Sequence, residues 1–245
     1  MKQKILFILL TSLFTQLYSQ VNTIDFQLSL GPTLSVPKTS ELTNSNVSGS
    51  PEIKSSINIG VFILPSINYF ISEKSSIDFG VGYYLDRFSI EDKIGYVTHK
   101  GNRNIHQIQT PINFNFHFGN DKSYQFGIGA FAIFTVAAKE KGDSNVDSSR
   151  IDFIDPSDPL VYNNISIGYE KDIKDNYNSV SFGTYLQLKK SISFSASKKG
   201  FILLKINQYI NAIKNNDTDS DLSQYVEFKN EKEPMTVNLG VGLIL

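Results

Sequence analysis

Residues 57–71 read Ile-Asn-Ile-Gly-Val-Phe-Ile-Leu-Pro-Ser-Ile-Asn-Tyr-Phe-Ile. The odd-numbered positions, from Ile57 to Ile71, are all apolar or aromatic, whereas several even-numbered positions, among them Asn58, Gly60 and Asn68, are small or polar. A period of two places alternate side chains on opposite faces of a β-strand. The stretch therefore predicts a strand with one apolar face and one largely small, polar face.

The same alternation recurs along the chain and predicts about eight strands. We expect them at residues 24–36, 57–71, 77–88, 105–118, 124–138 and 180–188, within 192–212, and at 235–245. The connections alternate in length: residues 73–75, 119–123 and 189–191 are expected as tight turns, and 37–56, 89–104, 139–179 and 213–234 as long polar loops. Short turns at one end and long loops at the other are typical of an up-and-down β-barrel in a bacterial outer membrane.

The N-terminus has the features of an export signal. Lys2 and Lys4 precede an apolar run that extends to Leu13, and the small residue Ser19 ends a suitable cleavage site. The apolar run is shorter than the roughly 20 residues that a membrane-spanning helix needs. We therefore expect a signal peptide at residues 1–19 and a single outer-membrane β-barrel domain at residues 20–245.

The composition excludes several classes of function. The chain has no cysteine, which rules out disulfides, thiolate metal sites and a lipoprotein anchor. A net charge of -1 and a pI of about 6.3 give no sign of a nucleic-acid partner, which needs a basic surface. The mean hydropathy of -0.16 is too polar for a bundle of membrane helices, but it suits a barrel, whose strands are only half apolar.

A soluble β-sandwich or lipocalin-like barrel also has one apolar face, so alternation alone leaves that alternative open. The polar face favours the membrane barrel, because it is rich in Gly, Ser, Asn and Gln and poor in Lys and Glu, as a crowded interior requires. Aromatic residues also gather near the expected strand ends, as in interfacial girdles: Tyr69, Phe70, Tyr83, Tyr84, Phe118, Tyr124 and Tyr209. We therefore expect an all-β, antiparallel transmembrane barrel.

The chain resembles the small outer-membrane β-barrel proteins of Bacteroidota, the porin-family or PorT-like group. The resemblance covers most of the expected mature chain. It rests on the signal end at residues 18–20, the Phe-Gly-x-Gly segments at 79–82 and 126–129, the pair at 182–183 after a long acidic loop, and the ending at 238–245. Such barrels usually end in an aromatic residue that the insertion machinery recognises, whereas this chain ends in Leu245. The departure concerns the efficiency of assembly more than the fold.

The sequence gives little sign of catalysis or metal binding. Its three histidines lack metal-site spacing, and neither a Gly-x-Ser-x-Gly elbow nor a phosphate-binding glycine loop is present. The segment from Asp217 to Asp221 begins like a calcium loop, but Leu222 and Phe228 occupy the positions that need Gly and Glu. We expect no enzyme activity, no metal site and no cofactor, and leave open weak calcium binding by the acidic loops.

Polar residues on the inward phase predict a filled interior. A barrel of about eight strands has an interior that side chains just fill, and buried charges must be paired. We expect an internal polar network, with an ion path as the alternative. Its expected members are Asp78, Asp86, Asn113, Asn115, His117 and Lys205, and Asp25 and Lys189 share their phase.

Three functions remain open at this point. The first is a non-enzymatic outer-membrane barrel with a structural or surface-interaction role, which contacts lipid around its wall and a protein or surface partner at its external loops. The second is a narrow pore or an accessory of an outer-membrane secretion system, which the family resemblance keeps open. The third is a soluble periplasmic lipocalin-like binder. The loops at 139–179 and 213–234 are the best candidates for partner contact, because loops on rigid scaffolds usually carry recognition.

Overall fold

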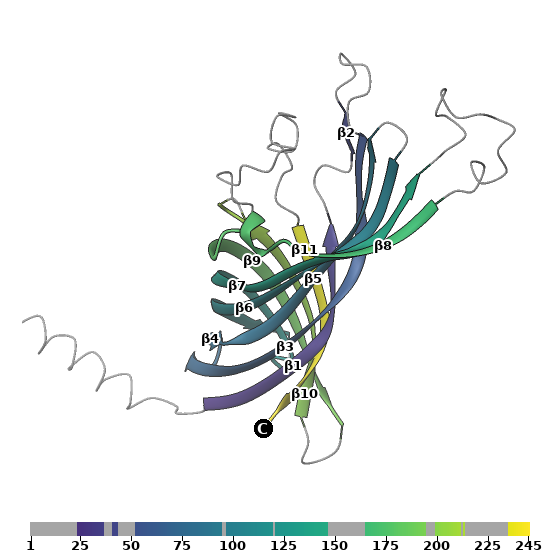
Figure 1. Ribbon diagram of the computed structural model, residues 1–245. Helices are drawn as coiled ribbons and strands as arrows, with labels where there is room; N and C mark the ends of the chain where they lie inside the picture. The colour runs from purple at the N-terminus through teal and green to yellow at the C-terminus, as the bar shows by residue number, and fades with distance from the viewer. Residues whose placement is uncertain are drawn as a thin grey trace, which may run out of the picture.

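The computed structural model describes residues 24–36, 41–43, 52–94, 97–119, 121–146, 165–194, 199–211, 213 and 235–245. This part of the chain is almost entirely antiparallel sheet (Figure 1). The strands are β1 (Ile24–Val36), β2 (Glu41–Thr43), β3 (Glu52–Ser72), β4 (Ser75–Gly80), β5 (Gly82–Ile94), β6 (Val97–Phe118), β7 (Tyr124–Val146), β8 (Ile165–Asp172), β9 (Val180–Ser193), β10 (Lys199–Tyr209) and β11 (Met235–Ile244), and a short 3-10 helix, η2 (Lys174–Asn176), follows β8. Among these residues, no helix is long and apolar enough to cross a membrane.

Eight barrel strands close into a ring. They follow one another as β1, β3, β4 with β5, β6, β7, β9, β10 and β11, and β11 pairs with β1 to complete the circle. β4 and β5 form one barrel strand interrupted at Val81, because Phe79 and Gly82 keep the same register against β6. A closed ring satisfies its backbone hydrogen bonds internally, as lipid requires. The predicted all-β, antiparallel up-and-down barrel is confirmed.

The outer face of the ring is apolar. On β3, the outward Val61 and Ile63 are 52% and 44% exposed, whereas the residues that alternate with them, Phe62 and Leu64, are buried. The alternation continues around the ring, so large apolar side chains cover its outside, including Phe79, Ile112, Phe126, Ile128, Phe182, Leu186, Ile202 and Val241. An apolar surface of this extent suits lipid and not water.

Four strands continue beyond the ring on one side (Figure 1). β7 has 23 residues and β6 has 22, about twice the 9–11 that cross a membrane. Along β5 the outward side chains change from Tyr83 and Leu85 to Arg87, Ser89 and Glu91. We call this open sheet the extension; it consists of residues 41–43, 52–57, 87–94, 97–104, 139–146 and 165–172.

The predicted turn at residues 189–191 is wrong, although those at 73–75 and 119–123 connect strands as expected. Lys189, Lys190 and Ser191 lie within β9, where they pair with Leu203, Ile202 and Phe201 of β10. Adjacent lysines resemble a turn signal, but here they continue the alternation. Lys189 points inward to an ion pair, and the Lys190 ammonium lies 5.4 Å from the ring centroid of Tyr124.

The long loops are shorter than predicted. The expected loop at 89–104 is mostly the paired ends of β5 and β6, the loop at 139–179 contains the end of β7 and all of β8, and the loop at 37–56 contains β2 and the start of β3. These segments have no lipid-facing side, so the apolar alternation that reveals a strand is lost although the pairing continues. The expected signal peptide, residues 1–19, and most of 213–234 lie outside the described residues.

Glycines make room for large side chains inside the ring. Phe131 lies opposite Gly183, and Tyr185 lies opposite Gly129. A Cβ atom at Gly183 would lie 2.2 Å from the Phe131 ring, which is far inside van der Waals contact. Each of these inward-facing glycines therefore lies beside an aromatic ring of the neighbouring strand, and that ring fills the space that the glycine leaves.

Candidate functional site: the filled barrel interior

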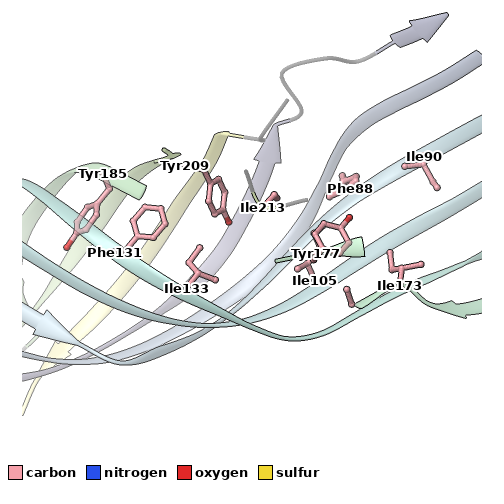
Figure 2. Close-up of a cluster of buried hydrophobic side chains, with 11 residues drawn as sticks. Phe88, Ile90, Ile105, Phe131, Ile133, Ile173, Tyr177, Tyr185, Tyr209 and Ile213 are labelled. Carbon is pink, nitrogen blue, oxygen red and sulfur yellow. The ribbon is translucent and has the colours of Figure 1, made fainter. Parts of the chain in front are cut away.

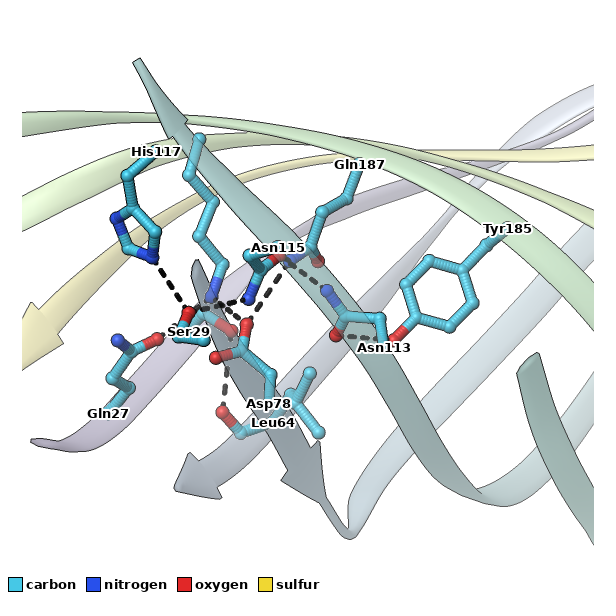
Figure 3. A network of polar contacts seen from close by, with 11 residues as sticks. Gln27, Ser29, Leu64, Asp78, Asn113, Asn115, His117, Tyr185 and Gln187 are labelled. Atoms are coloured by element: carbon cyan, nitrogen blue, oxygen red, sulfur yellow. Dashed lines mark hydrogen bonds and ion pairs between the residues drawn. The ribbon is translucent and has the colours of Figure 1, made fainter. Parts of the chain in front are cut away.

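The polar part of the interior is centred on an ion pair between β9 and β4. Lys189 Nζ lies 2.6 Å from Asp78 Oδ2, and the two side chains are 5% and 7% exposed. The same ammonium donates to Gln27 Oε1 at 2.9 Å, and the same carboxylate oxygen accepts from Gln187 Nε2 at 3.1 Å (Figure 3). Burying a charge is costly unless it is paired and hydrogen-bonded. Lys189 meets both conditions, and Asp78 meets them through Oδ2, while Asp78 Oδ1 is buried without a hydrogen-bond partner.

Neutral polar side chains extend this ion pair along β6. Asn113 donates to Asn115 Oδ1, which also accepts from Gln187 at 2.9 Å. Asn115 Nδ2 donates to Ser76 Oγ at 3.3 Å, and Ser76 Oγ lies 2.8 Å from His117 Nε2. Side chains of β4, β6 and β9 thus form one network across the lumen (Figure 3), and such networks rigidify an interior when their groups are satisfied.

The contact between Ser76 and His117 has the distance expected of a nucleophile and its base. Ser76 is 0% exposed, however, and His117 is 8% exposed. Ser76 Oγ also accepts from Asn115. A substrate has no access to a hydroxyl in this position, so the pair serves as a structural contact within the network.

Lys205 lies in an aromatic cage in the middle of the barrel. Its Nζ atom is 4.1 Å from the ring centroid of Tyr185, 5.3 Å from that of Tyr84 and 5.9 Å from that of Phe131. Nζ also donates to Tyr84 Oη at 3.4 Å. In the described part of the chain, no carboxylate forms an ion pair with Lys205. Desolvated contacts between a cation and ring faces are each worth up to about 2 kcal/mol, so the cage partly takes the place of a counter-ion.

Asp86 lies in a separate cluster nearer the extension. Tyr209 Oη donates to Asp86 Oδ2 at 2.9 Å. Gln107 Nε2 donates to the same tyrosine oxygen at 3.3 Å, and Gln109 Nε2 donates to Gln107 Oε1 at 3.3 Å. The cluster ties β5, β6 and β10 together across the lumen.

An apolar cluster fills the lumen toward the extension. Figure 2 shows it running from Tyr185 and Phe131 inside the ring to Ile90 on the extension. Ile173 and Tyr177, from the segment after β8, pack onto it. Backbone hydrogen bonds hold that segment in place, from Ile173 N to Ala138 O at 2.9 Å and from Asn178 N to Ile213 O at 2.7 Å. The other members are Phe88, Ile105, Ile133, Ala138, Tyr209 and Ile213.

A small cavity lies in the polar part of the interior. A cavity of about 10 Å³ lies among Asp78, Asn113, Tyr185, Lys189 and Lys205, which is about the minimum for one water molecule. Within the described ranges, no group of three His, Asp or Glu residues is placed to hold a metal ion. Side chains from several strands of the ring thus meet across the lumen.

The structure places each residue that the sequence assigned to the interior on the inner face of the barrel. Asp78 and three of the others share the first network, whereas Lys205 and Asp86 occupy environments of their own. The full set is Asp78, Asp86, Asn113, Asn115, His117 and Lys205, all buried.

Two aromatic residues expected in the interfacial girdle are inside the barrel. Tyr84 is 0% exposed and Tyr209 is 4% exposed, so their predicted place is wrong. The alternation along each strand could have placed both residues inside. Tyr84 is on the same face of its strand as Asp86, and Tyr209 is on the same face as Lys205. Residues two apart on a strand share a face, and this outweighs the position of a residue near a strand end.

A comparison with protein-family models finds a match that covers nearly the whole chain. A family model described as "Outer membrane protein beta-barrel domain" matches residues 14–243. No curated protein matches the chain significantly.

Several solved structures are similar to the chain over most of its length. OprG from Pseudomonas aeruginosa is 10% identical with a TM-score of 0.43, and the comparison covers 90% of this chain and 95% of OprG. Neisserial surface protein A is 10% identical with a TM-score of 0.39, covering 91% of this chain and 99% of that protein. Ail of Yersinia pestis, solved with the heparin analogue sucrose octasulfate, is 10% identical with a TM-score of 0.37, covering 91% and 100%. At these identities and TM-scores the similarities carry no argument about this chain.

Proposed function

The chain belongs to the outer membrane protein beta-barrel domain family, and from this premise we propose that it is a non-enzymatic, non-conducting barrel that displays a rigid sheet at the cell surface for contact with a partner. It is an outer-membrane protein, in contact with lipid around its wall. The observation that carries the proposal is the extension, because β6 and β7 are about twice as long as the bilayer requires.

The extension has internal contacts that favour a rigid display element. Glu140 accepts from Arg103 Nε at 2.8 Å and from Tyr169 Oη at 2.9 Å, so one carboxylate joins β6, β7 and β8. Burial and the hydrogen bond to Glu140 raise the pKa of Tyr169, so the hydroxyl stays protonated as a donor at neutral pH. Tyr169 also lies opposite Gly142, which lies opposite Gly101, and so packs across two strands.

The orientation follows from loop length. Outer-membrane barrels have short periplasmic turns and longer external loops. The turns at 73–75 and 119–123 are short, whereas the extension lies at the other end of the strands. We place the extension outside the cell and, with it, the region of partner contact.

Export and family subgroup belong to the same proposal. Lys2, Lys4, the apolar run and Ser19 support a signal peptide at residues 1–19, with the mature chain starting at Gln20. The Phe-Gly-x-Gly segments support the Bacteroidota porin-family or PorT-like group.

A narrow pore or secretion accessory is the second candidate. The charged residues on the inward phase, among them Lys205, favour it, because an ion path needs such a lining. The filled interior favours a closed barrel, since eight strands leave a lumen sized for side chains. The soluble lipocalin-like alternative has no support, because its apolar face would point inward and here it points outward.

The absence of native cysteines allows a direct test of orientation. Lys93→Cys places a thiol on the extension, and Lys74→Cys places one at a short turn. A membrane-impermeant maleimide added to intact cells should label the first variant and leave the second unlabelled until the cells are permeabilised. If only the Lys74→Cys variant were labelled in intact cells, the proposed orientation would be wrong and the short turns would face outside.

Two further measurements address conduction and contact. The purified monomer in planar bilayers should show no large, stable channels, and reproducible porin-sized conductance would favour the second candidate. A photo-cross-linking residue in place of Lys93 should give a discrete protein adduct in intact cells. The same residue in place of the lipid-facing Ile63 is the control and should give none. If the residue in place of Lys93 gave no protein adduct, the proposed surface-contact role would be wrong.

A further inference from the structure

Arg87 lies where the apolar outer face of the ring, here called the apolar belt, meets the extension. It points outward on β5, one outward position beyond Leu85. Arg87 pairs with Asn104 on β6, and Asn104 pairs with Lys139 on β7, so the three residues form one row across the sheet. The next outward row toward the membrane contains Leu85, His106 and Ala137, and His106 Nδ1 lies 2.7 Å from Tyr83 Oη, another outward residue of β5. This row therefore lies where the wall passes from hydrocarbon to lipid headgroups.

The side chain of Arg87 is unpaired in the described part of the chain. Its Nε atom is buried and has no hydrogen-bond partner, and no ion pair or side-chain hydrogen bond of Arg87 or Asn104 is present among the described residues. A guanidinium has five N–H donors, and leaving a buried donor unsatisfied is unfavourable. Arg87 therefore requires an acceptor that comes from outside these residues.

The acidic groups nearby are engaged elsewhere. Glu170 on β8 lies 3.1 Å from Lys139, and Asp172 is opposite Lys139 in register. The next acidic residue on the outward face of β5, Glu91, lies 3.4 Å from Lys100. The charge at the β8 end of the row is thus largely balanced, and the β5 end has an unpaired cation.

We propose that Arg87, with Asn104 beside it, binds the phosphate of a membrane lipid headgroup. The planar fork of a guanidinium matches phosphate oxygens in pairs, and such charge-assisted hydrogen bonds are the strong ones. The Asn104 amide supplies a neighbouring donor. The apolar stem of an arginine can lie along the belt while its head reaches the headgroup. The site depends on insertion into the membrane, and it does not depend on the surface-contact role.

Native mass spectrometry from maltoside micelles tests the site with a matched pair of lipids. Phosphatidic acid supplies the phosphate, and diacylglycerol with the same chains lacks it. The wild-type protein should retain phosphatidic acid in preference to diacylglycerol. Arg87→Gln should retain it about tenfold less well, as the loss of a hydrogen bond to a charged group implies. Circular dichroism and heat-modifiability on gels show whether the variant still folds.

Lys93→Gln is the matched control. Lys93 is on the same face of β5, six residues further along and so roughly 20 Å above Arg87, and its removal changes the charge equally. Lys93→Gln should retain phosphatidic acid as the wild type does. Equal retention by Arg87→Gln and Lys93→Gln would overturn the site. Displacement of the lipid by millimolar inorganic phosphate would also overturn it, since it would indicate a site for a soluble anion.

Discussion

Asp78 and Lys189 are 111 residues apart in the sequence, and Lys189 Nζ donates to Asp78 Oδ2 at 2.6 Å in the middle of the barrel. Neither β4 nor β9 pairs with the other, so the contact crosses the lumen. It links opposite walls of the ring through charge, where the remaining links are mostly neutral hydrogen bonds and packed rings. The buried ion pair is therefore the contact whose loss should matter most to the closed interior.

Asp78→Asn should lower the free energy of unfolding by about 3–5 kcal/mol, because it leaves the Lys189 ammonium buried without its counter-ion. Urea unfolding of the barrel in lipid vesicles measures this. Asp78→Leu combined with Lys189→Met should recover much of the loss, since replacing both charges by apolar groups removes the unpaired charge. A single variant as stable as the wild type would show that the pair does not stabilise the interior.

Glu73 and Lys122 provide an exposed comparison at the same 2.6 Å distance. Their side chains are 75% and 45% exposed, so solvent screens the attraction. Glu73→Gln should leave the unfolding midpoint unchanged within error. A loss comparable with that of Asp78→Asn would mean that burial does not determine the difference between the two pairs.

Gly183→Ala should destabilise the barrel by about 1–3 kcal/mol through overpacking. The new Cβ atom would lie 2.2 Å from the ring of Phe131 and 2.6 Å from the backbone oxygen of Gln208. Adding Phe131→Leu should restore part of the stability. Gly168→Ala on β8 is the control, because its nearest atom, Asp143 Oδ1, is 3.6 Å away. The heat-modifiability midpoint on gels compares the variants, and equal midpoints would contradict the steric account.

Ile63→Arg should cost about 2–4 kcal/mol if this outward residue of β3 lies near the bilayer midplane. Ser56→Arg, on the same strand but on the extension, should cost little, because its exposed position is in water. Folding yield and urea unfolding in vesicles report both. Similar effects of the two substitutions would place the apolar belt elsewhere on β3.

The turn that contains Glu73 should respond to acid. A hydrogen bond from Lys122, together with the lysine charge, lowers the pKa of Glu73 below its ordinary value. A carboxylate with a lowered pKa stabilises the fold above its unfolded pKa, about 4.3, and loses that contribution as the pH falls through the folded pKa. Because Glu73 and Lys122 are exposed, solvent screening keeps this contribution too small to move the unfolding midpoint, so the titration itself is the readout. Lys122→Ala should therefore raise the pKa of Glu73 in an NMR titration. An unchanged titration would exclude the contact in solution.

The alternation at residues 57–71 and in seven similar segments determined most of this fold. A period of two assigns every side chain to one of two faces, and this assignment needs no knowledge of strand partners. The lipid-facing Ile63 and the inward Asp78, Asn113 and Lys205 follow from it. These are local properties, so the sequence alone predicted them.

Only the tertiary structure decided the partners and the strand ends. The inward phase of Asp78 does not say that Lys189 faces it across the ring, because that depends on how many strands close and in what register. The sequence predicts loops for the extension, because its outer face is polar and its strands are supported by pairing with distant segments. Their positions near strand ends predict Tyr84 and Tyr209 at the membrane border, yet both fill the interior. The physical reason is the same in each case: hydrogen bonds, ion pairs and packing across a barrel join residues far apart in sequence, and no local pattern contains the distance between them.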